Sequence, residues 1–261
     1  VRGGSEDVSY FVSANYSDAE GTLPTQGSKD GGFRANLDFR PFEDLGIALN
    51  TAYTRRSSQF VEDGNNGNGF LLNVGRGTNG NFKGGKEDDC ANVNVLCVSN
   101  RYLFDTENTA GSDRYTTGLI LNYAPSEAFS NRLSIGWDFL RVGSEEWEPF
   151  GHIRTRLGSY ALRADKREKL SLDYSGSFQN MFSDRIASTF SWGGQIFRDR
   201  ARQGYNQTAN FSGPGRPILT SGSASPSVDD QVVEVTNAGF FLQEIIGLDD
   251  RLFLTAGLRV D

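Results

Sequence analysis

A single histidine limits the catalytic chemistry open to this chain. His152 is the only histidine among 261 residues, so a histidine-rich metal centre is excluded. A hydrolase site of the Ser/His/Asp type would have to be built on His152, with Ser144, Glu145 and Glu146 as candidate partners. Such residues are more often solvated loop side chains. We therefore expect a protein that is not an enzyme and that carries no cofactor.

Two further motifs have ligand-binding character, and each has a simpler interpretation. Residues 75–80 read GRGTNG and match G-x-G-x-x-G, a pattern that indicates dinucleotide binding only between a strand and a helix. Here the motif lies in a Gly/Asn-rich stretch with no helical period after it. Acidic side chains at 62–63 and 87–89 offer oxygen ligands for Ca²⁺, but without EF-hand spacing. We predict a flexible loop at 75–80 and solvated acidic loops at 62–63 and 87–89.

Arg198, Arg200 and Arg202 alternate along one predicted strand and so share one of its faces. Arginine forms paired hydrogen bonds with phosphate and carboxylate groups. The three side chains suit lipopolysaccharide phosphates or an acidic substrate, and pairing with neighbouring acidic residues is the alternative. The chain as a whole carries a formal charge of −7. No nucleic-acid partner is expected, because such binding depends on neutralising phosphates.

The two cysteines, Cys90 and Cys97, lie close together in a stretch rich in Gly, Asn and Asp. With no other cysteine and no histidine nearby, a disulfide that closes a loop in an oxidising compartment is a better prediction than a metal site. We expect the two residues to be bridged.

Most of the chain follows the two-residue period of β-strands. Mean hydropathy is −0.47, and no run approaches the roughly 18 apolar residues of a membrane-spanning helix. A strand of a membrane barrel turns only alternate residues to lipid, so its average hydropathy stays modest. Apolar and polar residues alternate in nine predicted strands, over residues 8–16, 33–39, 45–53, 115–123, 133–139, 170–178, 186–196, 232–246 and 252–260.

The connections between these strands alternate in length. Short turns fall at 41–44, 125–130, 182–184 and 247–250. Long connections fall at 18–32, 55–113, 141–168 and 199–231. This alternation is typical of a barrel with tight turns at one rim and long loops at the other, whereas a soluble β-sandwich, the alternative, need not alternate. The predicted fold class is all-β, an antiparallel up-and-down transmembrane β-barrel segment.

In such a barrel the apolar side chains meet lipid and the polar ones line a wet lumen. The lipid-facing side chains are expected to include Phe33, Leu37, Trp137, Leu172 and Leu254. The lumen-facing side chains are expected to include Arg34, Asp38, Arg40, Asp138 and Asp173.

Both ends of the chain resemble TonB-dependent outer-membrane receptors. Residues 240–244 (FFLQE) and 250–261 (DRLFLTAGLRVD) resemble one hairpin of that family. Residues 3–13 (GGSEDVSYFVS) resemble the first barrel strand of its SusC/RagA-like branch, and 33–37 and 50–53 lie where that branch has its second and third strands.

The resemblance implies an outer-membrane protein of a Gram-negative-type bacterium, with a barrel of about 22 strands around an N-terminal plug. Residues 1–261 would form a partial barrel domain of roughly nine of those strands, with the plug and the remaining strands absent from this chain. Because the plug would supply their partners, the charged lumen residues are expected to be unpaired within the chain, namely Arg34, Arg40, Asp138 and Asp173.

The function implied by the resemblance is active import of a bulky nutrient: an oligosaccharide, a peptide or a metal chelate. A passive porin or a surface-binding barrel is the alternative, and a barrel hydrolase is a third. The implied partners are outer-membrane lipid, the TonB complex through the missing N-terminal region, and a SusD-like surface lipoprotein over long loops such as 55–113.

Overall fold

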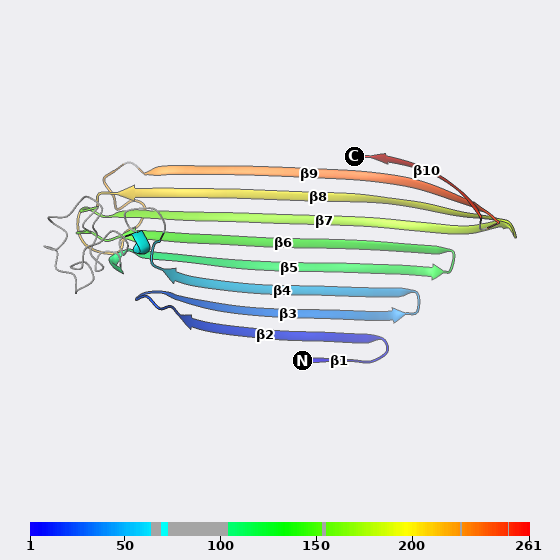
Figure 1. Cartoon of the computed structure of the whole chain (residues 1–261), viewed down its shortest axis with the longest axis horizontal. Helices are drawn as coiled ribbons and strands as arrows, with labels where there is room; N and C mark the ends of the chain where they lie inside the picture. Colours follow the sequence, from blue (N-terminus) through cyan, green and yellow to red (C-terminus); the bar gives the residue numbers. More distant parts are fainter. Residues whose placement is uncertain (64–68, 73–103, 153–154, 225, 250) are drawn as a thin grey trace.

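Ten antiparallel strands form one sheet in the part of the chain that the computed structural model describes, residues 1–63, 69–72, 104–152, 155–224, 226–249 and 251–261 (Figure 1). The strands lie side by side in sequence order, and each pairs with its neighbours along the chain. They are β1 Arg2–Gly4, β2 Val8–Glu20, β3 Gly27–Phe42, β4 Leu45–Phe60, β5 Glu107–Ser126, β6 Phe129–Glu148, β7 Ser159–Ser183, β8 Ile186–Ala209, β9 Ser227–Leu248 and β10 Leu252–Val260.

The predicted fold class is confirmed, and the nine predicted strands correspond to β2 through β10. The sequence did not predict β1, which pairs Arg2 with Phe11 and Gly4 with Ser9 at one edge of the sheet. Its three residues include two glycines and show no alternation of apolar and polar side chains. A strand this short is held by its neighbour's ladder rather than by a pattern of its own.

Several strands extend well beyond the predicted ranges, so the long connections were overestimated. The expected loop 18–32 shrinks to 21–26, 141–168 to 149–158, and 199–231 to 210–226. In the added segments neither face is apolar, as in β7 over 163–169. Backbone pairing continues there because it needs no side-chain pattern, and periodicity cannot detect such a segment.

The predicted alternation of short and long connections is confirmed. Turns of two or three residues join β3 to β4, β5 to β6, β7 to β8 and β9 to β10, and they lie at the end of the sheet opposite the loops (Figure 1). Asp249, in the last of these turns, has a φ of 51°, a left-handed conformation that aspartate tolerates. Its carboxylate accepts two hydrogen bonds of 2.6 Å from the guanidinium of Arg185, in the neighbouring turn.

The register divides the side chains between two faces. Residues directly opposite in an antiparallel ladder point to the same side. One row across the sheet consists of Leu37, Leu49, Leu119, Ile135, Leu172 and Ile196. The adjacent row consists of Asp38, Ala48, Ile120, Ser134, Asp173 and Gln195. We call the sides that these rows define the apolar face and the polar face.

The apolar face is uncovered. Trp137 is 38% exposed and Phe33 is 45% exposed, and many other large apolar side chains on this face are also exposed. Aromatic rings contact one another across strands, with centroids 5.4 Å apart for Tyr115 and Trp137 and 6.0 Å apart for Phe129 and Trp192. A soluble β-sandwich would pack these residues between two sheets, so that alternative is wrong for the described residues.

The buried hydrophobic residues are few and lie at the loop end of the sheet. Within the described ranges they are Val61, Tyr160, Ala161 and Phe211. No helix among the described residues is long and apolar enough to cross a membrane. The strands are therefore organised by backbone pairing and by their two faces, and a small packed core exists only where the loops begin.

Candidate functional site

The polar face brings together four of the five side chains expected to line a lumen. Arg34 and Asp138 lie in one row, through Ala52 and Thr116. Asp38 and Asp173 share another row, four residues along β3 from Arg34.

Arg40, the fifth, follows Phe39 at an irregularity in the β3–β4 register, and its backbone N–H donates to the carbonyl of Asp7 at 2.7 Å. The predicted residues are thus spread over β3, β6 and β7 and do not form one compact cluster.

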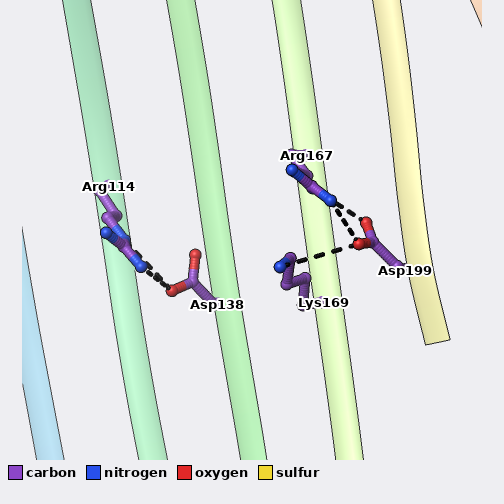
Figure 2. A network of polar contacts seen from close by, with 5 residues as sticks. All are labelled: Arg114, Asp138, Arg167, Lys169 and Asp199. Atoms are coloured by element: carbon purple, nitrogen blue, oxygen red, sulfur yellow. Dashed lines mark hydrogen bonds and ion pairs between the residues drawn. The ribbon is translucent and has the colours of Figure 1, made fainter. Parts of the chain in front are cut away.

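Ion pairs run across the middle of the polar face (Figure 2). Arg114 donates to one oxygen of Asp138 at 3.1 and 2.6 Å, from β5 to β6. Arg167 donates to both oxygens of Asp199 at 3.1 and 2.6 Å, from β7 to β8, and Lys169 lies 3.8 Å from the same carboxylate. Bases and acids therefore alternate over four neighbouring strands.

The expectation that Asp138 would be unpaired was wrong. Its partner, Arg114, belongs to the adjacent strand, two residues along from the directly opposite Thr116. A diagonal pair of this kind is within reach of a long side chain. For Arg34, Arg40 and Asp173, no ion pair occurs within the described residues. The polar wall is thus partly neutralised by its own strands.

A second cluster lies at the loop end, where the β8–β9 connection contacts β5 and β6. Arg216 donates to Glu107 at 3.1 Å and to Glu145 at 3.0 Å, and its guanidinium lies 5.5 Å from the centre of the Trp147 ring. Burial, with the negative charge of Glu145 nearby, raises the pKa of Tyr160 beside this cluster. One arginine therefore ties a long loop to three strand-end residues.

His152 lies in a buried polar cluster beside this loop contact. The histidine is 2% exposed, with its Nε2 3.4 Å from the Thr106 hydroxyl and its Nδ1 3.9 Å from Glu148. Glu148 also accepts hydrogen bonds from Thr155 and, at 2.8 Å, from Ser159. The hydroxyl, imidazole and carboxylate are all buried, and their separations exceed the roughly 2.6–3.2 Å of a working triad. The cluster is a polar core for the loops.

The contacts described for His152 are to Thr106 and Glu148, whereas the sequence proposed Ser144, Glu145 and Glu146 as its partners. Glu146 lies opposite Asn108 in the β5–β6 ladder. Glu145 pairs with Arg216, and Ser144 lies opposite Arg163 in the β6–β7 ladder. Cys90, Cys97, the 75–80 motif and the acidic stretch 87–89 lie outside the described residues. At 62–63, the Asp63 carboxylate accepts a hydrogen bond from the Leu71 N–H at 3.2 Å, and the described part of the chain contains no group of three residues suited to a metal ion.

Comparison with known proteins agrees with this architecture. No protein-family model matches the chain. TonB-dependent receptor P26 of Formosa agariphila is 39% identical over 67 residues, which are 25% of this chain and 7% of that protein. The RagAB peptide transporter has a TM-score of 0.73 at 14% identity, over 99% of this chain and 30% of the solved chain. The fold is that of a TonB-dependent receptor barrel.

Solved TonB-dependent receptors for iron chelates share the fold less closely. The ferric preacinetobactin receptor BauA of Acinetobacter baumannii has a TM-score of 0.55 at 13% identity, over 99% of this chain and 37% of its own. The ferric citrate transporter FecA has a TM-score of 0.51 at 13% identity, over 99% and 33%. The SusC/RagA-like resemblance expected from the sequence is therefore confirmed at the level of fold. The chain spans about a third of the length of these solved chains.

Proposed function

We propose that this chain is part of the wall of an outer-membrane transporter that actively imports a bulky nutrient. The observation that carries the proposal is the division of one long-stranded sheet into an uncovered apolar face and a polar face crossed by ion pairs. Lipid would cover the first, because exposed apolar surface of this extent requires a non-aqueous neighbour. Water and a plug domain would cover the second.

The lumen is the proposed location of the polar face, with Arg34, Asp38, Asp138 and Asp173, and also of Arg40. Cysteine labelling in the intact receptor tests this placement. Arg34→Cys and Asp173→Cys should react with a water-soluble maleimide, whereas Leu37→Cys, on the apolar face, should react only with a lipid-soluble reagent. The unsubstituted receptor controls for Cys90 and Cys97. Equal labelling of both faces by the water-soluble reagent contradicts the proposal.

Dependence on energy separates active import from the rival, a passive pore. The probes are a labelled peptide digest, an oligosaccharide mixture and a ferric chelate, offered to cells with and without the intact receptor. Receptor-dependent uptake of one probe should cease when TonB is deleted or when the proton gradient is collapsed. Uptake that persists under both conditions supports the passive pore instead.

A surface lipoprotein of the SusD-like type is the proposed partner at the loop end. The strand ends at Phe60, Glu107, Glu148, Ser159, Ala209 and Ser227 all lie at that end of the sheet, and the described loop residues beside them would form part of the contact surface. Affinity purification of the intact receptor should recover such a lipoprotein, and shortening the 210–226 loop should weaken its recovery. RagAB is a peptide transporter, and the three probes above do not assume a nutrient class for this protein.

A further inference from the structure

Five cations lie together just beyond the apolar side chains of β6, β7 and β8. We call them the outer cation patch: Arg141 on β6, Lys166 on β7, and Arg198, Arg200 and Arg202 on β8.

The register places the patch on the apolar face. Arg198 lies opposite Leu170, which lies opposite Trp137. Phe139 lies opposite Glu168. Two residues further along the strands, Lys166 lies opposite Arg141 on one side and Arg202 on the other. The patch therefore continues the rows of apolar side chains and does not belong to the polar face with its ion pairs.

This placement decides between the two ligands that the sequence left open for Arg198, Arg200 and Arg202. An acidic substrate travelling through a lumen would meet the polar face, which lies on the other side of the sheet. On the apolar face, the first charged side chains follow directly after the last apolar ones, as Arg141 follows Phe139 and Arg198 follows Ile196. That border is where the headgroups of a surrounding lipid layer would lie.

The patch is only partly neutralised by acidic residues. Arg198 pairs with Glu234 at 2.8 Å and Arg202 with Asp230 at 2.6 Å, both on β9, and Arg200 lies 3.7 Å from Glu234. Two more carboxylates share this face: Glu168 lies directly opposite Arg200, and Asp113 lies directly opposite Arg141 but pairs with Arg55 at 3.8 Å. For Arg141 and Lys166, no ion pair occurs among the described residues, and both side chains are exposed. Like charges directly opposite in a ladder repel each other, and an anion between the strands would relieve that repulsion.

We propose that the outer cation patch binds the phosphate groups of lipids in the outer leaflet. Guanidinium and ammonium groups on three adjacent strands offer several charge-assisted hydrogen bonds to one phosphate. Arg141 and Lys166 contribute charges that form no ion pair among the described residues, and Arg200 has the longest ion-pair distance of the three arginines on β8. The inference rests on the proposed outer-membrane placement.

The test uses the intact receptor, purified from outer membranes in mild detergent, with lipid A as the probe and native mass spectrometry as the measurement. The variant Arg141→Gln/Lys166→Gln/Arg200→Gln should lose about tenfold in affinity for lipid A, corresponding to the loss of at least one charge-assisted hydrogen bond. The matched control, Arg34→Gln/Arg132→Gln/Arg163→Gln, removes the same charge from the polar face and should bind like the wild type. If the triple variant fails to fold, the single variant Lys166→Gln, at an exposed position, replaces it. Its loss of affinity for lipid A should be smaller.

Dephosphorylated lipid A should bind wild type and patch variant equally weakly, and inorganic phosphate at millimolar concentration should not replace lipid A. Equal affinity of patch and control variants for lipid A, or no preference for the phosphorylated lipid, overturns the inference. Displacement of lipid A by millimolar inorganic phosphate indicates an adventitious anion site only and also overturns it. Recovery of the receptor outside the outer-membrane fraction contradicts the proposed function, and the inference with it. Normal recovery with equal lipid binding contradicts the inference alone.

Discussion

The strand wall and the loop end of this molecule are stabilised in different ways. In the wall, between the turns and the ends of the apolar rows, large apolar side chains remain exposed and the ordering element is the backbone ladder. At the loop end, Tyr160, Phe211 and His152 are buried, and His152 lies beside Thr106 and Glu148. On the proposed placement the apolar face of the wall is covered by lipid, whereas the loop end buries part of its own side chains. Substitutions in the wall should therefore affect the stability of the whole sheet, whereas substitutions at the loop end should affect only the loops.

The largest effect is expected from a charge in the middle of the apolar face. Ile135 lies between Leu119 and Leu172, so Ile135→Arg should destabilise the folded intact receptor in lipid bilayers by about 2–4 kcal/mol. The measurement is equilibrium unfolding in urea. The control is Ser134→Arg, which faces the other side beside Asp173 and should change stability by less than about 0.5 kcal/mol. An equal loss of unfolding free energy in both variants would contradict the assignment of the two positions to different faces.

A smaller and more local effect is expected from the buried polar cluster. His152→Ala leaves Thr106 and Glu148 without the imidazole, which should cost the loop end about 1–3 kcal/mol. Amide hydrogen exchange should accelerate in residues 104–108 and 155–159, while heat-modifiable migration of the barrel stays unchanged. His152→Gln retains a hydrogen-bonding side chain and should lose less. If His152→Ala instead unfolds the whole barrel, the loop end and the wall are one cooperative unit.

The contact of Arg216 is more exposed and should contribute less. Its side chain is 56% exposed, so Arg216→Ala should cost about 1 kcal/mol from the ion pairs with Glu107 and Glu145 and the contact with Trp147. Faster hydrogen exchange confined to residues 210–224 would show the loss. Arg216→Lys keeps the charge but not the planar fork, and should lie between wild type and alanine. Identical exchange in all three proteins would show that the loop is held by other contacts.

The two faces of the wall could be predicted from the sequence because the alternation of apolar and polar residues within each strand is enough to assign them. Leu37 and Asp38 are adjacent, and the two-residue period alone sends them to opposite sides. The ends of the strands could not be predicted, because the ladder of β7 continues through 163–169 where no apolar face marks it. A strand as short as β1 gives no periodic signal at all.

The loop-end cluster could not be predicted for a different reason. Arg216 and Glu107 are 109 residues apart in the chain, and neither belongs to a recognisable motif. The pair between Arg114 and Asp138 needs the register of β5 on β6, which the sequence leaves undetermined to within a residue or two. The acidic neighbour of His152 is Glu148, four residues earlier, and only the reversal of the chain after β6 brings Thr106 to its other side.

The smallest effect is expected at the turns, at the end of the sheet away from the loops. The hydrogen bonds from Arg185 lower the pKa of Asp249 below its usual range. A lowered carboxyl pKa contributes stability above the ordinary aspartate value of about 3.9, and that contribution is lost as the pH falls through the lower folded value. The backbone hydrogen bonds of this turn, from Asp249 to Arg185 and from Arg251 to Leu248, should therefore open more often as the pH falls below about 4.

Amide exchange of Asp249 and Arg251, corrected for the intrinsic pH dependence, measures this opening between pH 3 and pH 6. Asp249→Asn keeps a side chain that tolerates the positive φ of 51° but removes the charge, so its turn should open equally at all these pH values. Glu127→Gln removes a charge from the β5–β6 turn and should leave the β9–β10 turn unchanged. If Asp249→Asn retains the wild-type pH dependence, the ion pair with Arg185 does not stabilise the turn, and its left-handed backbone conformation alone accounts for the aspartate.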